Sequence, residues 1–155
     1  MDSHKQDQEY ESIVKEVFSE KIPFNKLLGL QIESITPDCI KVFFAMRDDL
    51  VGNYTRGMLH GGVISSVIDA TGGLAAVIGI QEKMRGKTLE AKLERSWRVS
   101  TIDLRVDFLR PGVGKRFVVT AYTLRSGSKV VVIRIELHND QNDLVAVGTG
   151  SWITA

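Results

Sequence analysis

The chain has very few of the residues that build disulfide frameworks and metal sites. Its 155 residues include one cysteine, Cys39, and three histidines, His4, His60 and His138. A single cysteine excludes an internal disulfide, and this suits the reducing cytoplasm. No spacing of histidine and cysteine typical of a zinc site occurs. We therefore predict a cytoplasmic protein without a metal site.

The chain also has no large excess of positive or negative charge. Lys and Arg together number 20 against 19 for Asp and Glu, for a net charge of +1. Without a basic surface, nucleic-acid binding is not expected. The first ten residues are polar and lack the apolar core of a signal peptide. Hydrophobic residues at 43% and charged residues at 25% are ordinary for a soluble globular protein. The length predicts one domain, residues 1–155.

The feature that stands out is a long apolar stretch, residues 59–80, whose only charge is Asp69. It predicts a helix over about residues 61–80, close to 30 Å long, that is apolar all round. Such a helix is long enough to span a bilayer. Asp69 and the glycines instead favour a core helix with no membrane insertion. A buried carboxylate costs several kcal/mol unless it is paired, and Arg105 or Arg134 are candidate partners.

The segments around this stretch alternate between helical and strand patterns. Apolar residues at helical spacing predict an N-terminal helix within residues 1–20, and Pro23 ends it. Two short runs around Ile32–Ile35 and Ile40–Met46 predict an antiparallel hairpin. Residues 81–99 form a charged insertion, in which Thr88 caps a short surface helix with a stripe of Leu89, Leu93 and Trp97.

The last third of the chain has the two-residue period of β-strands. Four strands are predicted, at residues 101–108, 117–124, 130–138 and 144–154, joined by short loops as an antiparallel meander. With the hairpin, this makes a curved six-stranded sheet that wraps around one long helix. The fold class is α+β, in the hotdog arrangement.

Two motifs carry a resemblance to a known family. Leu59-His60-Gly61-Gly62, followed by Asp69, and the strand from Thr101 to Gly112 resemble hotdog thioesterases of the phenylacetic-acid-degradation (PaaI) type. The Val51-Gly52-Asn53 loop and the insertion at 81–99 are most similar to the bacterial YigI-like thioesterases. The resemblance covers roughly residues 20–155. It implies an acyl-CoA thioesterase of fatty acid metabolism, which releases free acid and CoA.

The residues themselves favour the same chemistry. Backbone N–H groups of Gly61 and Gly62 at a helix start can hold a thioester oxygen as its negative charge develops, although the glycines can also serve only the tight turn. Asp69 lies eight residues beyond Gly61 (69 − 61 = 8), about 12 Å along the helix. It therefore cannot easily serve the carbonyl held at its own helix start. Two antiparallel helices across a two-fold axis solve this. We expect a homodimer, as the resemblance also implies, and we expect dimers to pair into tetramers.

The remaining site residues are assigned as follows. Asp69 is the nucleophile or the general base. His60 orients the loop, caps the helix or contacts the thioester. Asn53 corresponds, through the resemblance, to an asparagine that positions the water or the carbonyl. Family members often place a serine or threonine where this chain has Gly73, so that either Thr71 or Ser66 substitutes or no residue does.

Coenzyme A is part of the substrate, and no other cofactor is expected. Its phosphates need cations and amide donors, and the resemblance implies Gly62, Arg110, Arg125, Ser126, Gly127, Ser128 and Lys129. An apolar slot beside the central helix, near Met58, Leu59 and the Leu89/Leu93/Trp97 stripe, favours a medium- to long-chain acyl group. Two alternatives remain open: a hotdog dehydratase or hydratase, and a non-catalytic acyl-CoA binding module.

Overall fold

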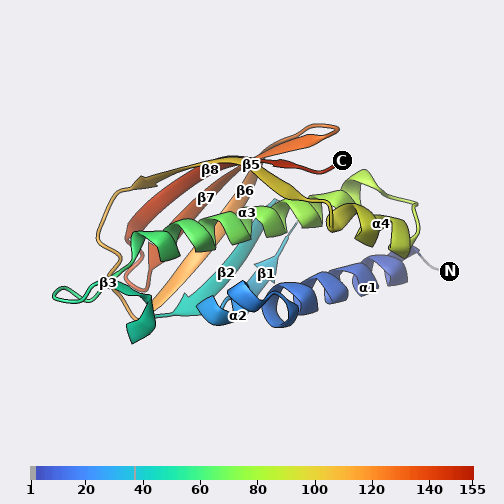
Figure 1. Ribbon diagram of the computed structural model, residues 1–155. Coiled ribbons are helices and arrows are strands. Elements are labelled where there is room, and N and C mark those ends of the chain that lie inside the picture. The colour runs from blue at the N-terminus through green and yellow to red at the C-terminus, as the bar shows by residue number, and fades with distance from the viewer. Residues whose placement is uncertain (1–2, 37) are drawn as a thin grey trace.

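The central helix, α3 (Gly61–Lys83), lies across one face of a six-stranded antiparallel sheet (Figure 1). The computed structural model describes residues 3–36 and 38–155. The strands are β1 (Gln31–Ile35), β2 (Cys39–Ala45), β5 (Ser100–Phe108), β6 (Arg116–Ser126), β7 (Val130–Asn139) and β8 (Leu144–Ile153), in the order β1-β2-β6-β7-β8-β5. This confirms the α+β hotdog fold.

The core lies between α3 and the central strands. Buried residues of the helix, such as Val67 and Ile68, meet the inward side chains of the sheet, where Phe44 and Phe117 stack at 5.3 Å between ring centroids. A methyl group at Gly148 of β8 would overlap Ile68, so this glycine lets the helix approach the sheet closely. By length and composition α3 could also cross a membrane, with a mean hydropathy of 1.8 over its most apolar window. Half of that window is buried inside the fold.

Two predictions about these elements are wrong. The helix is not apolar all round, because Ser66, Asp69 and Gly73 lie on a half-exposed face. The last four strands are not one meander, because β5 pairs with β8 and not with β6. Strand β5 has exposed side chains along most of its length, and such a strand fits the edge of a sheet better than its centre.

The N-terminal segment contains more helix than its pattern predicts. Helix α1 (Ser3–Glu16) continues through a π-helical turn (Val17–Lys21), and α2 (Pro23–Leu28) follows. Residues 1 and 2 of the predicted helix lie outside the described residues. Pro23 starts α2 rather than only ending the first helix, because the first position of a helix needs no N–H donor. These helices run beside α3, with α1 near its carboxyl end (Figure 1).

The loop before α3 and the insertion after it are also structured. A short 3₁₀ turn (Asp48–Leu50) precedes the small hairpin of β3 (Val51–Asn53) and β4 (Met58–Leu59). Within the insertion, Thr88 caps α4 (Leu89–Ser96), and its Oγ1 accepts the N–H of Ala91 at 3.3 Å, as predicted. Leu89 and Leu93 pack on the core.

Candidate functional site

A slot of about 480 Å³ runs along the half-exposed face of α3. Three groups of side chains form its walls. The N-terminal helices contribute one wall and α3 the opposite one, and the segment from α4 to β5, together with β8, forms the rest. The lining is mainly apolar and includes Val14, Phe18, Ile22, Phe24, Ala70, Gly73, Leu74, Val77, Trp97, Val99 and Trp152, with Ser66, Asp69, Ser96 and Thr101 among its polar members. A pocket of this size and character suits an apolar ligand with one reacting polar group.

Asp69 lies at this slot and not in the core. Its carboxylate is half-buried, and Oδ1 accepts a hydrogen bond from Thr101 Oγ1 at 2.8 Å. The arginines proposed as partners lie elsewhere, since Arg105 pairs with Asp107 and Arg134 with Glu136. A carboxylate that touches solvent and one hydroxyl needs no buried cation. Its second oxygen is therefore available to a ligand in the slot.

The hydroxyls proposed in place of a residue at Gly73 also bond elsewhere. Thr71 donates to the Val67 carbonyl at 2.7 Å, and Ser66 donates to the Gly62 carbonyl at 2.6 Å. The hydroxyl that contacts Asp69 is instead that of Thr101. Sequence reasoning missed it because it lies 32 residues away on β5. The only available signal was its place at the start of the family-like strand.

His60 caps α3, which was one of its three proposed roles. Its Nδ1 accepts the Gly62 N–H at 2.8 Å, and a Cβ at Gly62 would lie only 2.9 Å from that nitrogen. The Gly62 N–H is therefore occupied, contrary to the prediction that both glycines offer free donors. Among the described residues, none accepts the N–H of Gly61. Of the two glycines, Gly61 is therefore the one whose N–H is open to a ligand at this helix start.

Asn53 lies in the β3–β4 hairpin next to this helix start. Its Oδ1 accepts a hydrogen bond from Thr55 Oγ1 at 2.7 Å, so its amide nitrogen remains directed away from that contact. The neighbouring Gly52 packs against His60, where a Cβ would come within 2.6 Å of the His60 Cα. The hairpin thus packs through Gly52 on the residue that caps the helix, and Asn53 follows Gly52 in the chain.

The residues proposed for coenzyme A fall into two groups at opposite ends of the sheet. Arg110 follows β5 at the Gly61 end, and its Nη1 donates to the Leu144 carbonyl at 3.0 Å. The turn of Arg125, Ser126, Gly127, Ser128 and Lys129 connects β6 to β7 at the other end, beside α4. Arg95 donates to the Ser128 carbonyl at 3.1 Å, and this bond ties the turn to α4. One chain does not bring the two groups together.

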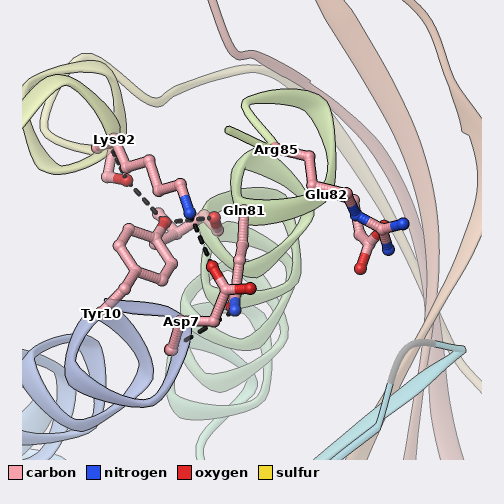
Figure 2. A network of polar contacts seen from close by, with 8 residues as sticks. Asp7, Tyr10, Gln81, Glu82, Arg85 and Lys92 are labelled. Atoms are coloured by element: carbon pink, nitrogen blue, oxygen red, sulfur yellow. Dashed lines mark hydrogen bonds and ion pairs between the residues drawn. The ribbon is translucent and has the colours of Figure 1, made fainter. Parts of the chain in front are cut away.

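A buried polar cluster lies behind the apolar end of the slot (Figure 2). Lys92, only 2% exposed, forms an ion pair with Asp7 at 2.6 Å. This hydrogen bond, above all, lowers the pKa of the Asp7 carboxyl. Tyr10 Oη donates to the Val77 carbonyl at 2.7 Å and lies 2.7 Å from Ser96 Oγ. Burial raises the pKa of Tyr10 to about 12, so its hydroxyl stays neutral. Sequence reasoning missed this cluster, because a lysine within a charged insertion looks like a solvated residue.

No group of three or more His, Cys, Asp or Glu side chains that could hold a metal occurs within residues 3–36 and 38–155. One buried side-chain polar atom in the same part of the chain has no hydrogen-bond partner, the Trp152 Nε1. It lies beneath Gly73, whose Cβ would be 3.7 Å away.

Comparisons with known proteins give a consistent result. Residues 56–146 match the family model described as Thioesterase superfamily. The chain is 38% identical to the medium/long-chain acyl-CoA thioesterase YigI of Escherichia coli K12, over 91% of both chains. A crystal structure of a putative thioesterase from Syntrophus aciditrophicus has a TM-score of 0.87 at 54% identity, and covers 97% of this chain and 99% of the other. A thioesterase-related protein from Shewanella oneidensis has a TM-score of 0.92 at 40% identity, with 96% and 97% covered.

Proposed function

This chain belongs to the thioesterase superfamily, and from that premise we propose that it hydrolyses acyl-CoA thioesters to free acid and coenzyme A. The membership confirms the resemblance that the His-Gly-Gly and Thr101–Gly112 motifs carried. The observation that supports the activity is the place of Asp69, a half-buried carboxylate at an apolar slot. The relative that acts on medium- and long-chain acyl-CoA favours a fatty acyl substrate.

The reaction needs a group that stabilises the oxyanion and a group that attacks or activates water. Gly61 supplies an unpaired N–H at a helix start, and Asp69 supplies the carboxylate. In our proposal the thioester oxygen accepts from Gly61, and Asp69 acts as nucleophile or general base. Thr101 holds the carboxylate in position. Asn53 orients the water or the carbonyl from the hairpin beside Gly61.

We propose that each site is completed by a second copy of the chain. Asp69 and Gly61 of one helix are about 12 Å apart (8 × 1.5 Å), too far to share one carbonyl. The unpaired edge of β5 carries exposed apolar side chains, with Ile102 and Phe108 56% and 55% exposed. Two copies paired along this edge would cover it. They would also place the Gly61 end of one subunit beside the opposite end of the other.

The same pairing gives a role to the two coenzyme A groups. Arg110 of one subunit and the turn 125–129 of the other would lie on the same side of the dimer, and together they would bind the phosphates. We propose a homodimer that pairs further into a tetramer, that works in the cytoplasm, and that uses no cofactor beyond the coenzyme A of its substrate.

Release of free thiol from a panel of acyl-CoAs, measured for wild type and for Asp69→Asn, tests the function. Asp69→Asn keeps the size of the side chain and removes the attacking or basic oxygen, so the rate should fall by about 10²-fold or more. Asp48→Asn is the matched control, since this exposed aspartate lies away from the slot. Turnover that Asp69→Asn leaves unchanged contradicts the mechanism. Tight binding without turnover by wild type would indicate a binding module, and hydration of an enoyl-CoA would indicate a hydratase.

A further inference from the structure

We infer that the slot beside α3 binds the acyl chain and limits the chain length that the protein accepts. Val77 sets this limit at the far end of the slot, at a length of about ten carbons. The inference rests on the proposed thioesterase function and deepens it. It assigns the choice of chain length to residues of the N-terminal helices, α3 and α4.

The slot has a polar end and an apolar end. Ser66, Asp69 and Thr101 line one part of it, and further along the same face of α3 come Ala70, Gly73, Leu74 and Val77. The opposite wall is Val14 and Phe18 from the N-terminal helices. A thioester carbonyl at Asp69 would therefore direct its alkyl chain along α3 towards Val77, because the α3 lining residues that follow Asp69 carry no polar side chain.

The side chains at the far end of the slot are held in place by hydrogen bonds and an ion pair. Val77 and Ser96 line it there, and the next turns of α3 contribute no lining residue. Tyr10 fills the space behind them, is 0% exposed, and bonds both the Val77 carbonyl and Ser96 Oγ. The Asp7–Lys92 ion pair, drawn beside Tyr10 in Figure 2, ties α1 to α4. Gln81 adds a weaker hydrogen bond to the Asp7 carbonyl at 3.4 Å. Helix α1 is thus fixed as a wall.

The length of the slot follows from the helix. Val77 lies eight residues beyond Asp69 (77 − 69 = 8), about 12 Å along the axis. An extended chain advances about 1.2 Å per bond, since three backbone bonds span at most about 3.6 Å. The slot therefore holds about ten carbons, and a longer chain must leave part of its tail in solvent.

The chain carries its own probes of occupancy, because its two tryptophans, Trp97 and Trp152, both line the slot. We would titrate the full-length protein with saturated free fatty acids of 4 to 16 carbons and follow tryptophan emission. In parallel, kcat/KM would be measured for the matching acyl-CoAs. Both affinity and kcat/KM should rise about fourfold for each added carbon up to about ten carbons and then level off.

Variants of Val77 test whether this residue sets the length limit. Val77→Phe should shorten, by about two carbons, the chain length at which affinity and kcat/KM level off (the levelling point). Val77→Ala should lengthen it. Ile78→Ala is the matched control. Ile78 is the next residue of α3, but it lines a different hollow between α3 and the β1–β2 edge, so the length profile should stay that of wild type. Should Val77→Phe fail to fold, Val77→Ala still tests the site.

The inference is overturned if wild type hydrolyses acyl-CoA while tryptophan emission is unaffected by any fatty acid. It is also overturned if the levelling point is the same in wild type and in the folded Val77 variants. If fatty acids bind with a break near ten carbons but no acyl-CoA is hydrolysed, the proposed function fails and the slot assignment stands.

Discussion

Removing Asp7 from its ion pair with Lys92 should destabilise the protein much more than removing Lys92. The Lys92 side chain is 2% exposed and the Asp7 side chain 29% exposed. Asp7→Asn leaves a buried ammonium without its counter-ion, and removal of one partner from a buried pair costs about 3–5 kcal/mol. Because water reaches Asp7, we take the low end, about 3 kcal/mol.

Lys92→Met removes the other partner at a much lower cost. The methionine fills a similar volume with apolar atoms, and the remaining carboxylate can turn to solvent. We expect about 1 kcal/mol or less, and about the same for the double variant, in which no charge is stranded. The two effects therefore do not add, and the coupling should be about 3 kcal/mol in size.

Urea unfolding of the four proteins at one protein concentration measures this cycle, because an oligomer's stability depends on concentration. In thermal unfolding, Asp7→Asn should lower Tm by about 6–12 °C, since 1 kcal/mol corresponds to about 2–4 °C for a chain of this length. If Asp7→Asn costs no more than Lys92→Met, or if the double variant shows the sum of both effects, the ion pair does not hold α1 to α4 as described.

Three further predictions concern single residues. Gly72→Ala should destabilise the protein by about 2 kcal/mol in urea unfolding, because the added methyl overlaps the ring of Trp152; no loss would show that the helix can shift at this point. His60→Ala should lower the free energy of unfolding by about 1 kcal/mol, because α3 loses its cap. Thr88→Ala, which removes the cap of α4, is the matched control. An unchanged urea midpoint for His60→Ala would argue against capping. The lowered pKa of Asp7 means that its ionised form stabilises the fold above about pH 4, and that this contribution is lost as the pH falls through the lowered pKa. Acid should therefore destabilise wild type more steeply than Lys92→Met, and parallel pH curves of Tm would contradict the assignment.

The elements with a clear period were predictable from the sequence. The helix from Gly61, the hairpin and the last three strands follow directly from patterns of apolar residues, and the Thr88 cap lies where its motif predicts. The neighbours of β5 were not predictable, because a two-residue period identifies a strand and one apolar face but not the strand beside it.

The candidate site was predictable in its residue types and less so in its surroundings. Asp69 was singled out as a lone charge in an apolar run, but the run itself suggested burial and an arginine partner. The structure gives it solvent and Thr101 instead. Whether a helix face is covered depends on which segments pack on it, and the N-terminal helices that wall the slot are distant in sequence. The solvent-exposed face of α3 could therefore not be predicted from the sequence of the helix alone.

Some residues that line the slot lie inside the region matched by the family model, and others lie outside it. The match covers residues 56–146, which include Gly61, Asp69 and Thr101. The helices α1 and α2 and the residue Trp152 lie outside it. Three of the groups proposed to act on the thioester thus belong to the matched region, while Asn53 and much of the wall around the proposed alkyl chain lie in flanking segments. On the slot assignment proposed above, substitutions in these flanking segments would alter which acyl chains are accepted and leave the hydrolytic step intact, so engineering of chain length can use them as well as Val77.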